Sequence, residues 1–123
     1  MVPPPSRRVL IVDDDESIRR MVCRLLTREN FEVDEARDGV EAIEKLDSGD
    51  YEVMVLDLMM PRIDGFQVVE YLRKNRPEML EHTVVATAFD DTARSRLDAP
   101  CRVVPKPFDI AELMLTVRRC ANS

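Results

Sequence analysis

The chain has 123 residues, of which 45% are hydrophobic and 34% charged, and its net charge is −6. A chain of this length forms one domain with a core of its own, and its acidic balance argues against direct binding to nucleic acid, whose phosphates attract basic surfaces. No apolar run approaches the roughly 20 residues that span a bilayer, and the first residues, MVPPPSRR, lack the apolar segment of a secretion signal, so we expect a cytoplasmic protein without membrane contact.

Short apolar runs alternate along the chain with segments of helical period, a pattern typical of β–α units around a parallel sheet. We predict a flexible leader over residues 1–7 and a single domain over residues 8–123. The first, third and fourth apolar runs are continuous, as in strands that are covered on both faces, and the second alternates, as in an edge strand. The predicted strands are residues 9–12, 31–36, 53–56, 83–86 and 103–104.

About five helices are predicted between and after these strands. Asp15 comes just before the first of them and suits an N-cap. The segment 89–100 has only two apolar residues four positions apart and ends at Pro100, so the fourth helix in chain order is expected to be short or irregular. The other four have apolar side chains at helical spacing within residues 18–26, 40–46, 66–72 and 110–117.

Polar side chains follow or end four of the five predicted strands. Asp13 and Asp14 follow the first strand, Asp57 the third and Thr87 the fourth, and Lys106 follows the fifth. Ligands of parallel sheets bind beyond the carboxyl ends of the strands, so we expect these side chains to meet at one edge. Carboxylates without His or Cys suit Mg²⁺, and a lysine and a threonine beside them suit the oxygens of a phosphoryl group. The set predicts phosphoryl transfer in which a carboxylate is the nucleophile.

The order and spacing of these segments resemble the receiver domains of two-component response regulators, from about residue 8 to the end. VLIVDDD is similar to the first strand of that family with its acidic pair, VLDLMMPRIDG to its phosphorylation strand and loop, and VVPKPF to its lysine motif. The resemblance implies a flavodoxin-like, doubly wound α/β fold with a five-stranded parallel sheet of order 2-1-3-4-5. That order places the first strand beside the third.

The resemblance also implies a function. A receiver accepts a phosphoryl group from a histidine kinase or phosphotransfer protein and signals through altered binding of an output partner or a fused output domain, with homodimer formation as one option. By position, Asp57 is the phosphoacceptor, and Asp13, Asp14 and Asp57 bind Mg²⁺ together with the backbone carbonyl of Met59. We expect no enzyme acting on an external substrate, but a phosphoacceptor that assists its own phosphorylation and dephosphorylation.

By the same resemblance, Thr87 and Lys106 contact the phosphoryl group. The family usually carries an aromatic residue three positions before the lysine, where this chain has Val103. The stretch from Thr87 to Lys106 is also shorter than in most members. We therefore expect the phosphorylation chemistry of the family, with a remodelled signalling surface.

Two alternatives stay open from the sequence. Asp13 and Asp15 after an apolar strand imitate the DxD nucleophile motif of haloacid-dehalogenase-like phosphatases, although the chain lacks room for a cap domain and has no later acidic pair. The second alternative is an interaction module that keeps the receiver fold without phosphorylation. Turnover of external phosphate esters would support the first alternative, and Mg²⁺-dependent binding of beryllofluoride would argue against the second.

Overall fold

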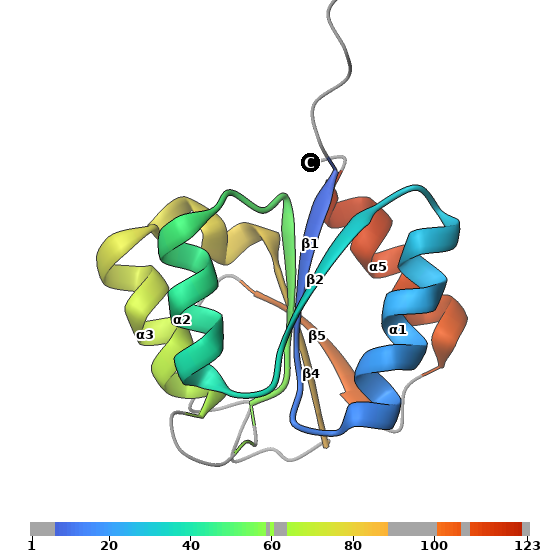
Figure 1. Cartoon of the computed structure of the whole chain (residues 1–123), viewed down its shortest axis with the longest axis horizontal. Helices are drawn as coiled ribbons and strands as arrows, with labels where there is room; N and C mark the ends of the chain where they lie inside the picture. Colours follow the sequence, from blue (N-terminus) through green and yellow to red (C-terminus); the bar gives the residue numbers. More distant parts are fainter. Residues whose placement is uncertain (1–6, 59, 61–63, 89–100, 107–108, 122–123) are drawn as a thin grey trace, which may run out of the picture.

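The computed structural model describes residues 7–58, 60, 64–88, 101–106 and 109–121, with the backbone alone for residues 87, 88, 105 and 106. These residues form three layers, in which a five-stranded sheet lies between α2 and α3 on one face and α1 and α5 on the other (Figure 1). The strands are β1 (Arg8–Val12), β2 (Glu32–Ala36), β3 (Val53–Leu56), β4 (Thr83–Ala88) and β5 (Arg102–Lys106). The helices are α1 (Glu16–Arg28), α2 (Gly39–Ser48), α3 (Gly65–Asn75), the 3-10 helix η1 (Pro77–His82) and α5 (Ile110–Ala121).

The strand order is β2-β1-β3-β4-β5, and all neighbouring strands are parallel. This order confirms the predicted fold, and all five predicted strands are present with small shifts at their ends. The chain leaves β1 toward β2 through α1 and returns past β1 to β3 through α2. Because both crossovers of such a sheet are right-handed, the reversal places α1 and α2 on opposite faces.

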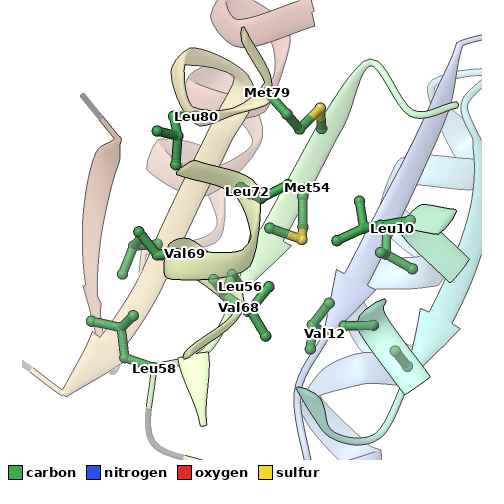
Figure 2. Packing of buried hydrophobic residues seen from close by; sticks show 14 of the residues in the cluster. Leu10, Val12, Met54, Leu56, Leu58, Val68, Val69, Leu72, Met79 and Leu80 are labelled. Atoms are coloured by element: carbon green, nitrogen blue, oxygen red, sulfur yellow. The ribbon is translucent and has the colours of Figure 1, made fainter. Parts of the chain in front are cut away.

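Side chains of the central strands alternate between the two faces of the sheet, as the pleat requires. Val9 and Ile11 of β1 pack on the face covered by α1 and α5, whereas Leu10 and Val12 pack on the face covered by α2 and α3. Figure 2 shows the second of these clusters, in which β1 and β3 contribute Leu10, Val12, Met54 and Leu56. Leu10 is fully buried, and removing a leucine side chain from such a core costs about 2–5 kcal/mol.

The inward face of α1 carries the predicted apolar stripe and one buried residue that was not predicted. Val22 and Leu26 are buried, and the other apolar residues of the stripe are partly buried and pack against the same cluster. The third buried residue of this helix is Arg19. The physical reason is that the Arg19 side chain has hydrogen-bonding partners in the turn after β1 and on β2. Ile110, which we predicted on the apolar stripe of the last helix, is 41% exposed because it stands at the first turn of α5.

The 3-10 helix η1 was not expected from the sequence. It is six residues long, which is too short to show a helical period, and Pro77 at its start is the one local signal. Met79 and Leu80 of η1 extend the cluster on the α2–α3 face, where Figure 2 labels both. This short element therefore closes one end of that cluster before β4 begins.

Some predictions fall on other parts of the chain. The short or irregular helix predicted within residues 89–100, and residues 1–6 of the predicted leader, lie outside the described residues. The limits of 1–7 and 8–123 for leader and domain stay a prediction. Within the described ranges, no helix combines the length and the apolar character that crossing a membrane requires.

Candidate functional site

The pairing of β1 with β3 brings two aspartates to the same edge of the sheet. Val12 pairs with Leu56 at the carboxyl ends of these strands, so the next residue of each strand, Asp13 and Asp57, stands at that edge. The Asp57 N–H donates to the Val12 carbonyl over 2.9 Å, which extends the pairing beyond the last residue of β3. The order 2-1-3-4-5 is therefore what makes these two aspartates neighbours.

Asp13, Asp14 and Asp57, hereafter the acid trio, each offer a carboxylate oxygen, and these oxygens all lie within 4.8 Å of one another. Asp13 and Asp57 are each 4% exposed, whereas Asp14 is exposed. Three negative charges at this spacing repel one another, and a divalent cation offsets that repulsion. Oxygen donors without nitrogen or sulfur fit Mg²⁺, which also keeps waters and binds phosphate oxygens. The exposed Asp14 leaves one side of the trio open to solvent.

Asp15 is an N-cap, as predicted, and has a different role from its neighbours. Its Oδ1 accepts from the Ile18 N–H over 3.1 Å at the start of α1. Its own N–H donates to Asp13 Oδ1 over 2.9 Å. The Asp15 carboxylate is thus engaged with the helix, which removes the geometric support for a DxD pair made of Asp13 and Asp15.

Arg19 is a residue of this site that the sequence analysis missed. Its Nη1 donates to the carbonyl oxygen of Asp13 over 2.9 Å, and its Nε donates to Glu35 Oε1 over 3.0 Å. The one signal in the sequence is position, because Arg19 stands three and seven residues before Val22 and Leu26, the buried residues of α1. Arginine so spaced is ordinarily read as an exposed charge.

The opposite side of the site is formed by the start of α3. Asp64 and Gln67 form a capping box there, in which each side chain accepts from the other residue's N–H. The Gly65 N–H donates to the Leu58 carbonyl over 3.0 Å, so α3 begins directly against the chain that follows Asp57. This contact fixes the direction in which the chain leaves β3.

Thr87 and Lys106 lie at the carboxyl ends of β4 and β5. Their backbones are side by side, since Thr87 pairs with Pro105 and Ala88 pairs with Lys106. Both strand ends lie at the same edge of the parallel sheet as the acid trio. The side chains of Thr87 and Lys106, and all of Met59, lie outside the described part of the chain, so their predicted roles stay predictions. Val103 is partly buried and packs against the cluster on the α2–α3 face.

A separate ionic cluster lies toward the amino ends of the strands. Asp34 Oδ2 accepts from the Tyr51 hydroxyl over 2.6 Å and from Arg8 Nη2 over 2.7 Å. The hydrogen bond from Tyr51, and then that from Arg8 with its charge, hold the pKa of Asp34 below its usual value despite partial burial. Burial, followed by the bond to Asp34, raises the pKa of Tyr51 to about 12. This cluster ties β1, β2 and the start of β3 together.

Comparison with known proteins agrees with this fold and site. The chain matches the model of the response regulator receiver domain over residues 9–118. It is 39% identical over 116 residues to the response regulator MprA of Mycobacterium ulcerans (strain Agy99), covering 92% of this chain and 49% of that protein. It is 38% identical over 114 residues to MprA of Mycobacterium avium (strain 104), covering 90% and 49%. The chain thus spans about half the length of the curated relatives it matches.

Solved structures give the same answer. The receiver domain of the Francisella response regulator 1452 superposes with a TM-score of 0.85 at 28% identity, covering 95% of this chain and 98% of that one. The response regulator TrrA of Thermotoga maritima, in complex with Mg²⁺–BeF, superposes with a TM-score of 0.79 at 32% identity, covering 93% and 98%. Neither the phosphatase alternative nor the phosphorylation-independent module is favoured by these matches. By fold, by sequence and by its acid trio, the chain belongs to the response regulator receiver domain family, the signalling phosphoacceptors of two-component systems.

Proposed function

We propose that this domain accepts a phosphoryl group on Asp57 and that the acid trio binds the Mg²⁺ required for the transfer. The observation that carries this proposal is the approach of carboxylates from two different strands, Asp13 and Asp14 after β1 and Asp57 after β3, to within 4.8 Å. The phosphodonor is a histidine kinase or a phosphotransfer protein. A carboxylate oxygen of Asp57 attacks the phosphorus, the bond from phosphorus to the donor nitrogen breaks, and an aspartyl phosphate forms.

The residues around Asp57 divide the work. When bound, Mg²⁺ supplies positive charge to the transferring phosphoryl oxygens. Asp13 and Asp14 would hold it together with Asp57 and the Met59 carbonyl. The low exposure of Asp57 restricts access of bulk water to the reacting carboxylate, and the exposed Asp14 marks the open side of the trio.

Thr87 and Lys106 would complete the site from β4 and β5. Both residues stand at the carboxyl ends of neighbouring strands, where a hydroxyl and an ammonium suit phosphoryl oxygens. The added negative charge would reorganise this edge and change the binding of an output partner or fused output domain. The chain acts on no external substrate in this scheme, and it assists its own phosphorylation and dephosphorylation.

The test is incubation with Mg²⁺ and a small phosphodonor such as acetyl phosphate, followed by intact-mass measurement. The wild-type domain is expected to gain one phosphoryl group and Asp57→Asn none. Asp50→Asn is the matched control, because the Asp50 side chain is 98% exposed and lies at the other end of β3. Labelling of Asp57→Asn at the wild-type rate would exclude Asp57 as the acceptor.

A further inference from the structure

The Arg19 side chain is buried at the acid trio without being one of its acids. The residue is 7% exposed, whereas arginine is rarely fully buried in proteins unless it is paired. The next residue on the same helix, Arg20, has a side chain that is 66% exposed and pairs with Glu16 at the surface. The two arginines therefore offer a natural comparison, since only Arg19 reaches the site.

Arg19 holds the main chain of a residue in the trio. Its Nη1 donates to the Asp13 carbonyl over 2.9 Å, and the Asp13 N–H donates to the Ala36 carbonyl over 3.1 Å. Both backbone polar groups of Asp13 thus have partners. The Asp13 carboxylate accepts in addition from the Asp15 N–H over 2.9 Å. Because both its N–H and its carbonyl group are held, the backbone of Asp13 is fixed and its side chain has few possible positions.

Glu35 holds Arg19 in turn. Its Oε1 accepts from Arg19 Nε over 3.0 Å, and it precedes Ala36 at the end of β2. The strand β2 therefore anchors Asp13 by two routes, directly through Ala36 and indirectly through Glu35 and Arg19. The planar guanidinium suits this task because it donates to two acceptors in fixed directions.

We propose that Arg19 is a positioning residue for the cation site, which fixes the turn after β1 so that Asp13 faces Asp14 and Asp57 before any cation arrives. This inference rests on the proposed function of the acid trio. The ion pair of Arg19 with Glu35 is only partly buried, because the Glu35 side chain is 39% exposed, and a pair open to solvent contributes little to stability. The role of Arg19 is therefore in the geometry of the site rather than in the stability of the helix.

The direction in which Mg²⁺ affinity changes when the Arg19 charge is removed separates this proposal from a simple charge effect. A guanidinium close to a dication repels it, so removing the Arg19 charge would by electrostatics alone tighten Mg²⁺ binding. Removing a positioning residue instead weakens binding, because the trio loses its preset geometry. Partners that orient metal ligands are typically worth 10–100-fold in metal affinity.

The experiment titrates Mg²⁺ into the phosphate-free domain by calorimetry, and follows the rise of the melting temperature with Mg²⁺ as a second readout. Arg19→Met keeps an unbranched apolar stem and is expected to weaken Mg²⁺ binding about tenfold, at the lower end of that range because Arg19 contacts the ligand residue through its backbone. Arg20→Met removes the same charge from the surface and is the matched control. Its Mg²⁺ affinity is expected to be unchanged or slightly higher.

Two further variants keep the test decisive if Arg19→Met folds poorly. Glu35→Gln still accepts from Nε but loses the charge that orients Arg19, and it is expected to weaken Mg²⁺ binding about threefold through a weaker hydrogen bond. Arg19→Lys keeps the charge without the fork and is expected to fall between wild type and Arg19→Met. In the Arg19→Met background Glu35→Gln should have no further effect, since Glu35 acts through Arg19.

Wild-type affinity or tighter binding in Arg19→Met would overturn the inference, as would wild-type affinity in both Glu35→Gln and Arg19→Lys. These outcomes leave the proposed function intact as long as the wild-type domain binds Mg²⁺ and labels Asp57. A wild-type domain that binds no Mg²⁺ would overturn the proposed function first and this inference with it.

Discussion

A β-carbon on Gly65 would lie 2.5 Å from the carbonyl oxygen of Asp57 and 2.4 Å from the Cα of Leu58. Both neighbours are backbone atoms, so no change of side-chain rotamer can relieve such a contact. Only glycine lets α3 begin this close to the chain that leaves β3. The position of Asp57, the residue we propose as phosphoacceptor, therefore depends partly on the absence of a side chain at Gly65.

Gly65→Ala is expected to lower the free energy of unfolding by about 1–3 kcal/mol, the range for overpacking a dense site. Because the backbone at Asp57 must shift, phosphorylation by a small phosphodonor should also slow. Urea unfolding and intact-mass labelling measure the two effects. Gly49→Ala is the control, since its β-carbon would meet the end of the flexible Arg8 side chain at 3.3 Å. Equal losses in both variants would contradict the steric argument.

Asp15 variants separate capping from catalysis. Asp15→Ala removes the acceptor for the Ile18 N–H and is expected to cost about 1 kcal/mol of stability, whereas Asp15→Asn keeps a side-chain oxygen and should cost much less. Both variants should still become phosphorylated on Asp57. Loss of labelling in Asp15→Asn, despite a native circular dichroism spectrum and melting temperature, would show that Asp15 takes part in the phosphorylation reaction.

Asp14→Asn tests the cation site through stability. The substitution removes one of three charges that repel one another, so the melting temperature without Mg²⁺ should not fall. A ligand that binds only the folded state stabilises it by about 2.7 kcal/mol at 100 times its Kd, and this gain should shrink in Asp14→Asn because a ligand is lost. Calorimetric melting with and without Mg²⁺ gives both quantities. An Mg²⁺-induced rise as large as in wild type would exclude Asp14 from the site.

The Tyr51–Asp34 bond predicts a pH-dependent contribution to stability. The pKa of Asp34 is held below its unfolded value of 3.8, chiefly by the Tyr51 hydroxyl, so its contribution is present above that pH and is lost as the pH falls through the folded value. The pKa of Tyr51 is raised from 10.0 to about 12, chiefly by burial and then by Asp34, so its contribution is present below pH 10 and is lost as the pH rises through about 12.

Tyr51→Phe should accordingly lower the free energy of unfolding by about 1 kcal/mol at pH 7, the typical net value of a hydrogen bond. The difference from wild type should diminish in strong acid and above pH 12, and urea unfolding across this range measures it. The phenyl ring keeps its place under the Arg8 guanidinium, which lies 4.9 Å from the ring centre, so packing is preserved. A difference that is constant over the whole range would show that the hydroxyl–carboxylate bond is not its source.

Much of this fold could be predicted because most of its strands are visible in the sequence as short apolar runs. The continuous runs of β1 and β3 are explained by cover on both faces of these strands, and β2 is the edge strand that its alternating run predicted. The acids at the ends of β1 and β3 could be predicted to lie at one edge, because the carboxyl ends of parallel strands share it, and the strand order implied by the resemblance made them neighbours. Candidate site residues that lie in short motifs at strand ends can thus be predicted from the sequence alone.

The supporting residues could not be predicted in the same way. Arg19 looks like Arg20 in the sequence, and only the positions of Asp13 and Glu35 explain why one is buried and the other exposed. The 3-10 helix at Pro77–His82 is too short for any periodic signal. The need for glycine at residue 65 arises from a contact between segments whose approach the sequence does not specify.

Asp13 and Asp57 follow strands that are neighbours in the sheet but not consecutive in the chain, and this affects when the site can form during folding. Between them the chain must build α1, β2, α2 and β3, and β3 must dock beside β1, before the two carboxylates come together. A nascent, clipped or partly melted copy in which this docking has failed would not bring the acid trio together, so under the proposed function it would not accept a phosphoryl group. Under that proposal, the ability to be phosphorylated is gained and lost together with the pairing of β1 and β3.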